Sequence, residues 1–179
     1  MATESESKTR LRTGHEKYLE VSERWSGLAV LTMRLLIGWQ FLLAGIIKFV
    51  VPNWSAKPYL IHGVPEANPF VGFFTAMAKS SWMPIINGFN MWGLTLVGLA
   101  LILGVAVRFS AFWGGVVMWF YWASSLPLEN SVFVNEHIVY IALLFFLGAF
   151  GAGRYYGLDK YIEDMQIVED NPWLRYLLG

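Results

Sequence analysis

Polar and titratable side chains interrupt the apolar stretches of this sequence at positions that could meet at one level of a helical bundle. Lys48, His137 and Tyr140 can donate hydrogen bonds to ring carbonyls, and Glu136 can relay protons. Further polar or aromatic groups that would line the same pocket are Arg34, Asn87, Asn90 and Trp122. Such a set suits a flat, partly polar headgroup such as a quinone. The competing interpretation is that Glu136 simply pairs with Lys48, which would neutralise two charges near the membrane edge.

The segment 27–51 is apolar for about the ~20 residues that a helix needs to cross a bilayer, yet it contains Arg34 and Lys48. Steps of four and three residues place Arg34, Gly38, Phe41, Gly45 and Lys48 on one helix face. An arginine in hydrocarbon costs at least ~2.5 kcal/mol, so this face is predicted to turn toward protein. A tyrosine or a backbone carbonyl would be a structural partner for Arg34, and a bound ligand is the alternative.

The elements that must position these groups are four long apolar segments, 27–51, 85–107, 109–126 and 133–152. They predict an all-α, integral membrane, four-helix up-down bundle. A short interfacial helix is expected at 69–78 in the first outer loop, with Asn68 as N-cap and Pro69 as its first residue. Small residues spaced four apart should let the third and fourth segments approach closely: Ser110 with Gly114, Ala111 with Gly115, Gly148 with Ala152, and Ala149 with Gly153.

The chain divides into a polar N-terminal segment (1–26), the membrane domain (27–152) and an amphipathic tail (153–179). Disorder is expected at the start of the first segment, with an interfacial helix from about Glu16. Lys and Arg concentrate in the two terminal segments and at Arg108, so both termini are predicted to be cytoplasmic in a multi-pass plasma-membrane protein. The outer loop then carries Asn53-Trp54-Ser55, a weak glycosylation sequon.

Composition excludes several functions. The chain has no cysteine, which rules out disulfides, thiolate metal sites and thiol relays within it, and its net charge of zero gives no indication of nucleic-acid binding. His137 is the one histidine inside the apolar segments, and no His, Asp or Glu cluster has metal-ligand spacing. Neither a metal nor a haem is therefore predicted. The aromatic run 119–122 is typical of an interfacial belt.

Several stretches together resemble the DoxX/DoxD family of four-helix membrane proteins, in its archaeal form. They are MRLLIGWQFLLAGIIKF, the loop with NPFVGFF, WGLTLVGLALILG, RFSAFWG, and the NEHIVY to GAFGAGRYYGLD ending. The pattern of Arg34, Gly38, Gly45 and Lys48 is the most specific part. The resemblance implies a membrane redox subunit of the respiratory chain. In DoxD, the reaction is oxidation of thiosulfate to tetrathionate coupled to quinone reduction, together with a second chain, DoxA.

Three functional hypotheses remain open from the sequence. The first is a quinone-linked redox subunit, with quinone as cofactor and a second membrane subunit, a redox complex or another copy of the chain as partner. The second is a non-catalytic scaffold subunit of a respiratory or other redox complex. The third is a small transporter, which the lack of a broken helix near the midplane disfavours.

Overall fold

The computed structural model describes residues 2–128 and 131–179, with side chains from residue 23 onward. Within these ranges the fold is all-α and contains no strand. The main helices are α1 (Ala2–Val50), α2 (Val71–Lys79), α3 (Met83–Leu103), α4 (Val107–Ser124) and α5 (Glu136–Ala149). Short helical turns complete it: η1 (Tyr59–Gly63), η2 (Ala152–Arg154), α6 (Asp159–Glu163), α7 (Gln166–Asp170) and η3 (Pro172–Tyr176).

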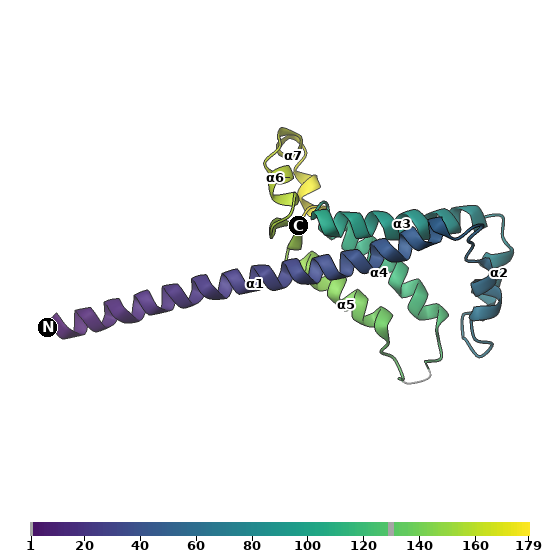
Figure 1. The fold of residues 1–179 in the computed structure, drawn as a ribbon, viewed down its shortest axis with the longest axis horizontal. Coiled ribbons are helices and arrows are strands. Elements are labelled where there is room, and N and C mark those ends of the chain that lie inside the picture. Colours follow the sequence, from purple (N-terminus) through teal and green to yellow (C-terminus); the bar gives the residue numbers. More distant parts are fainter. Residues whose placement is uncertain (1, 129–130) are drawn as a thin grey trace.

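The helices are arranged with two distinct ends (Figure 1). At one end, here called the loop end, lie η1, α2 and the connection between α4 and α5. At the other, the tail end, lie α6, α7 and the turn between α3 and α4. Helix α1 continues past the tail end toward the N-terminus. Its backbone is helical from Ala2, so the disorder expected at the start of the N-terminal segment is not found; the side chains before residue 23 lie outside the description.

Helices α1 and α3 pack antiparallel with their backbones in contact. A Cβ atom built on Gly98 would lie 2.6 Å from the Cα of Leu42 and 2.7 Å from the carbonyl oxygen of Gly38. One built on Gly45 would lie 2.6 Å from the backbone nitrogen of Thr95. The glycine face of the first apolar segment therefore faces protein, as predicted. Arg34 and Phe41 on that face are only 1% and 2% exposed.

Helices α4 and α5 form the second antiparallel pair. A Cβ on Gly114 would lie 3.1 Å from Leu144, and one on Gly148 would lie 3.4 Å from Ala111. These contacts confirm a close approach of the third and fourth segments at Gly114 and Gly148. Gly115, in contrast, has nothing within 4 Å of a built Cβ and is not part of the crossing. The tightest helix crossing is that of α1 with α3, which the sequence did not single out.

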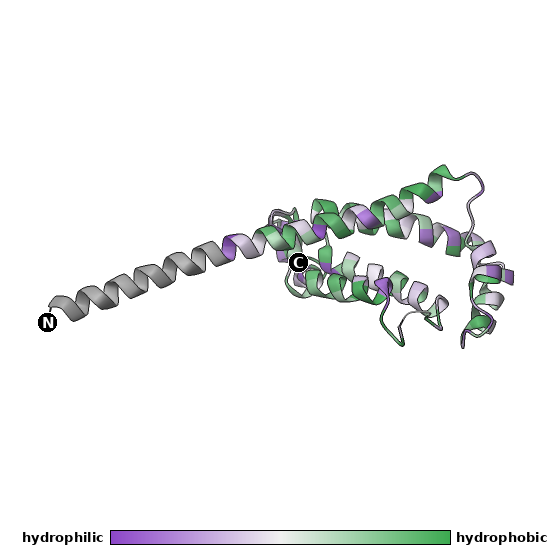
Figure 2. Ribbon diagram, turned by 60° about the horizontal axis from the view of Figure 1, so that its bottom comes forward, coloured by the Kyte–Doolittle hydropathy of each residue, from purple (hydrophilic) through white to green (hydrophobic). Residues whose placement is uncertain are grey.

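Many large apolar side chains of α1, α3, α4 and α5 are exposed. Hydrophobic residues run along the ribbons of these helices in Figure 2. Leu36, Trp39, Trp92, Phe112 and Phe145 are each more than half exposed. Two helical stretches, Glu23–Val50 and Met83–Leu103, are long and apolar enough to cross a membrane, and only 39% and 22% of their apolar windows are buried within the fold.

The fourth predicted segment is shorter than expected. Helix α5 has 14 residues and begins at Glu136, because the Asn135 side chain caps it by accepting hydrogen bonds from the backbone nitrogens of His137 and Ile138. It ends before Gly151, which adopts a left-handed φ of 63°. The expected span of 133–152 is therefore wrong at both ends. Helix α4 has 18 residues and matches the third predicted segment closely.

The short helix predicted in the first loop is confirmed, although it starts at Val71 rather than at Pro69. Asn68 is 3% exposed and precedes the helix. Its Oδ1 accepts from the Phe70 nitrogen at 2.7 Å, while its Nδ2 donates to the carbonyl oxygens of Ala123 at 2.9 Å and Leu126 at 2.8 Å. Asn68 therefore ties the loop to the C-terminal end of α4, where helix carbonyls lack intrahelical partners.

Candidate functional site

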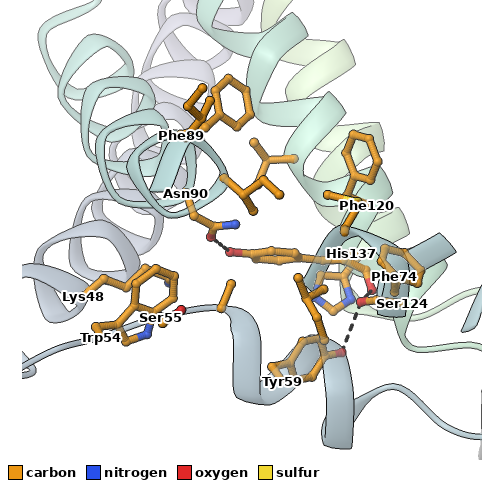
Figure 3. Close-up of a pocket in the computed structure, with 17 residues that line it drawn as sticks. Lys48, Trp54, Ser55, Tyr59, Phe74, Phe89, Asn90, Phe120, Ser124 and His137 are labelled. Carbon is orange, nitrogen blue, oxygen red and sulfur yellow. Dashed lines mark hydrogen bonds between the residues drawn. The ribbon is translucent and has the colours of Figure 1, made fainter. Parts of the chain in front are cut away.

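A cavity of about 610 Å³ lies at the loop end, between the end of α1, η1, α2, the start of α3, the end of α4 and the start of α5 (Figure 3). Its walls are mainly aromatic and aliphatic, with Trp54, Phe74, Phe89 and Phe120 among them. Its polar groups come from several elements: Lys48, Ser55, Tyr59, Asn90, Tyr121, Ser124 and His137. This combination of apolar walls and a few converging polar groups is typical of small-molecule sites.

Three of the predicted site residues, Lys48, Asn90 and His137, line this cavity together. The Lys48 ammonium donates to the carbonyl oxygen of Ala44 at 2.8 Å and lies 5.3 Å from the centre of the Trp54 ring. A cation at this distance from an indole face is attracted by the ring quadrupole. Lys48 is thereby held at the cavity wall, and within the described residues its two remaining N–H groups have no protein acceptor.

Tyr121 is a site residue that the sequence did not single out. Its hydroxyl donates a hydrogen bond to Asn90 Oδ1, which joins α4 to α3. The dashed line at Asn90 in Figure 3 marks this bond. Tyr121 stands within the aromatic run 119–122, which was interpreted as an interfacial belt. The signal that could have found it is spacing, since Gly114, Val117, Tyr121 and Ser124 follow one another at helical intervals on one face of α4.

The loop contributes further hydrogen bonds at the cavity edge. The Ser124 hydroxyl donates to the Tyr121 carbonyl at 2.9 Å, and the Tyr59 hydroxyl lies 3.1 Å from Ser124 Oγ. Asn87, another predicted site residue, lies beside the cavity, where its Oδ1 accepts from the Ala56 nitrogen at 3.0 Å. Asn87 therefore holds the loop in place and does not face the cavity itself.

The competing interpretation, in which Glu136 pairs with Lys48, is wrong. The Glu136 side chain is 71% exposed, and its carboxylate lies 3.9 Å from His137 Nδ1. The reason is the start of α5: because Asn135 is the N-cap, Glu136 occupies the first helical position and points outward. With Lys48 held at Ala44 and Trp54, the two groups form no ion pair.

Tyr140 and Trp122 lie apart from the cavity lining. Tyr140 packs edge-on against Phe41 in the bundle core, with ring centroids 6.2 Å apart. Trp122 donates from Nε1 to the Phe133 carbonyl at 2.9 Å and packs against the Phe133 ring. Both residues support elements that carry cavity residues. Tyr140 packs α5 against α1, and Trp122 joins α4 to the segment that precedes α5.

Arg34 lies at the opposite, tail end, where its partners are backbone carbonyls. Its Nη1 donates to Ala152 at 2.6 Å and Tyr155 at 3.1 Å, and its Nη2 donates to Tyr156 at 3.4 Å. These contacts support the structural role of Arg34 over ligand binding, because its Nη1 and Nη2 groups donate to backbone carbonyl oxygens. Arg34 Nε has no partner among the described residues.

A buried carboxylate completes the tail end. Asp159, which is 0% exposed, accepts hydrogen bonds from the backbone nitrogens of Ala106 at 2.6 Å, Val107 at 3.1 Å and Gly179 at 2.9 Å. Burial raises the pKa of this carboxyl, and the three N–H donors act in the opposite direction. At the surface nearby, a hydrogen bond to Glu163 raises the pKa of Arg154. Through Asp159, the tail end of the bundle holds together the α3–α4 turn, α6 and the C-terminal residue.

The chain is 24% identical over 162 residues to an uncharacterized protein of Haemophilus influenzae, a match that covers 85% of this chain and 93% of the relative. No family model matches the sequence, and no solved structure matches the fold. Within the described residues, no group of three or more His, Asp or Glu side chains could hold a metal ion.

Proposed function

We propose that this chain is an integral membrane protein whose loop-end cavity binds the ring of a quinone. The observation that carries the proposal is the cavity itself: apolar walls of suitable size into which Lys48, Asn90 and His137 converge from three helices. Cavities of ~300–1,000 Å³ with few, placed polar groups are usual for such ligands. Tyr121 adds a fourth group, through Asn90.

Membrane insertion is supported by the exposed apolar side chains on α1, α3, α4 and α5. A helix of 14 residues such as α5 is ~21 Å long, which is less than the ~30 Å hydrocarbon core. The segments that flank α5 would complete its crossing near the interfaces. The distribution of Lys and Arg supports a plasma-membrane orientation with the tail end and both termini in the cytoplasm and the cavity toward the outer leaflet.

The residues present fit a quinone ring. Lys48 and His137 would donate to its carbonyl oxygens, Asn90 would orient it, and Phe89 and Phe120 would pack against it. A quinone supplies two-electron acceptor chemistry when it is bound. The residues of this chain would bind and orient the ring and limit access of water to it.

The resemblance to the DoxX/DoxD family supports a redox role, with thiosulfate as the electron donor in DoxD. Joining two thiosulfate ions into tetrathionate releases two electrons, and a quinone that takes them also takes up two protons. Lys48, Lys57 and Lys79 are the cations at the loop end that could attract this dianion. The absence of cysteine from the chain favours a second membrane subunit that supplies the remaining chemistry.

The experiment is purification of the full chain from membranes in mild detergent, followed by extraction of bound quinone and a binding titration. We expect the full chain to stay in the membrane pellet after alkaline extraction. We also expect Lys48→Met to bind quinone at least tenfold more weakly than the wild type. Lys160→Met, at an exposed position at the tail end, is the matched control. Thiosulfate-dependent quinone reduction is then measured with and without co-purifying proteins. Co-purification with an oxidase and no quinone binding would instead support the scaffold function.

A further inference from the structure

Asn135 has a fixed amide orientation, because it is the N-cap of α5. Its Oδ1 accepts from the backbone nitrogens of His137 at 3.1 Å and Ile138 at 3.3 Å. Backbone N–H groups can only donate, so the atom that faces them must be the amide oxygen. The other end of the side chain is then the Nδ2 amino group, which can only donate.

This amino group determines which nitrogen of His137 carries the proton. Asn135 Nδ2 lies 3.1 Å from His137 Nδ1 and 3.1 Å from Ser125 Oγ. Because Nδ2 donates, Nδ1 must accept, and a neutral imidazole that accepts at Nδ1 carries its hydrogen on Nε2. The Glu136 carboxylate is 3.9 Å from Nδ1, which is too far to accept a hydrogen bond from it. Asn135 is therefore the closer partner.

Two further residues of the cavity keep N–H groups that can donate to a ligand. Asn90 Oδ1 is taken by the Tyr121 hydroxyl, which leaves the Asn90 amino group. Lys48 uses one N–H on Ala44 and keeps two. The Ser124 hydroxyl hydrogen is used on the Tyr121 carbonyl, so the Tyr59 hydroxyl donates to Ser124 Oγ. These hydroxyl groups, like that of Tyr121, can therefore offer a ligand only the lone pairs of their oxygens. Among the described residues, no carboxylate lines the cavity.

We infer that Asn135 fixes His137 as a neutral Nε2–H donor, and that the cavity therefore prefers the oxidised, carbonyl-bearing form of a quinone over the quinol. This inference rests on the proposed function. The N–H groups of Asn90, His137 and Lys48 favour the carbonyl oxygens of a quinone, which are stronger acceptors than the hydroxyl oxygens of a quinol. Within the described ranges of the chain, the hydroxyl hydrogens of a quinol would find only uncharged oxygens as acceptors at the cavity. His137 thus binds the ring, and Asn135 is a positioning residue.

The first test needs no ligand. Nitrogen-15 NMR of the full chain in detergent, labelled at histidine and recorded at about pH 8, distinguishes the two neutral tautomers. His137→Gln identifies the His137 signals by their loss. The Nε2–H tautomer is expected in the wild type. In Asn135→Asp the cap oxygen is kept but the donor is lost, so the Nδ1–H tautomer is expected there. The exposed Asn53→Asp is the control, with spectra like the wild type. An Nδ1–H tautomer in the wild type would overturn the inference.

The second test compares the affinities of a short-tailed benzoquinone and its quinol under anaerobic conditions. The wild type is expected to bind the quinone about tenfold more tightly, and Asn135→Asp is expected to lose most of that preference. Equal or tighter binding of the quinol by the wild type would contradict the inference while leaving the quinone site intact. Failure of both forms to bind would instead overturn the proposed function, and the NMR result would still decide the state of His137.

Discussion

Arg34 Nη1 donates to the carbonyl oxygen of Ala152 at 2.6 Å, across 118 residues of sequence. The arginine comes from the middle of α1, and the carbonyl belongs to the turn that follows α5. Burial of a charge among apolar helices is costly, and hydrogen bonds to its donors offset part of that cost. This contact therefore joins α1 to the tail segment. It does so through the Arg34 guanidinium, which would be the least favourable group of α1 to bury without acceptors.

Replacing Arg34 by Met should lower the free energy of unfolding by about 2–3 kcal/mol, because three backbone carbonyls would lose a charged donor. Thermal unfolding in detergent checks the stability, and limited proteolysis should show faster cleavage in residues 150–179. Arg24→Met alters an exposed arginine on the same helix and should leave both readouts unchanged. Equal effects of the two substitutions would mean that the contacts of the Arg34 guanidinium do not stabilise the tail end of the fold.

Gly98→Ala should destabilise the fold by about 2–3 kcal/mol, since the new methyl group would meet backbone atoms of α1 that cannot rotate away. Gly93→Ala, one and a half turns earlier on α3, has nothing within 4 Å of its built Cβ. That substitution should be neutral or stabilising by ~0.5–1 kcal/mol through helix propensity. Thermal melting of the two variants side by side makes the comparison, and loss of stability in Gly93→Ala would contradict it.

Asn68→Asp should keep the hydrogen bond to the Phe70 nitrogen but place a carboxylate oxygen against the carbonyls of Ala123 and Leu126. We expect a loss of about 2–3 kcal/mol, together with faster hydrogen exchange at the end of α4 and in α2. Asn53→Asp, at an exposed position in the same loop, is the control. Unchanged exchange in Asn68→Asp would show that the loop is held by other contacts.

Asp159→Asn should cost about 2 kcal/mol, because an amide offers one acceptor oxygen where three backbone N–H groups need acceptors at both carboxylate oxygens. Its amino group would face a donor at the α3–α4 turn or at Gly179. Asp164→Asn changes an exposed carboxylate in the same tail and should melt like the wild type. Denaturation followed by tryptophan fluorescence checks both variants, and an unchanged Asp159→Asn would be evidence against a structural carboxylate.

The buried face of α1 was predictable from the sequence. Arg34 and Lys48 lie on the same helix face as Gly38 and Gly45, and a face that carries two cations is too costly to expose to lipid. The level at which polar groups meet was also predictable, since Lys48, Asn90 and His137 do line one cavity. Whether these groups bind a ligand stays a prediction.

The choice of partners was not predictable. Glu136 and Lys48 have opposite charges and similar positions along their helices. Because Asn135 caps α5, however, Glu136 is the first helical residue and its carboxylate faces outward. A shift of one residue in the start of a helix changes the direction of such a side chain, and the sequence does not fix that start. Tyr121 was hidden because an aromatic run gives the same composition whether its members face lipid or a cavity. The acceptors of Arg34 are main-chain atoms of an irregular turn, for which no side-chain pattern exists.

The contact between Arg34 and the turn after α5 has a consequence for the order of assembly. A ribosome makes α1 first, and none of the three carbonyls that receive its guanidinium exists until the turn at residues 152–156 has been synthesised. While the four helices α2 to α5 are being made, that positive charge has to be solvated by something other than its final carbonyl acceptors. The hydrogen bonds that hold Arg34 in place can therefore form only after the chain has been made as far as residue 156.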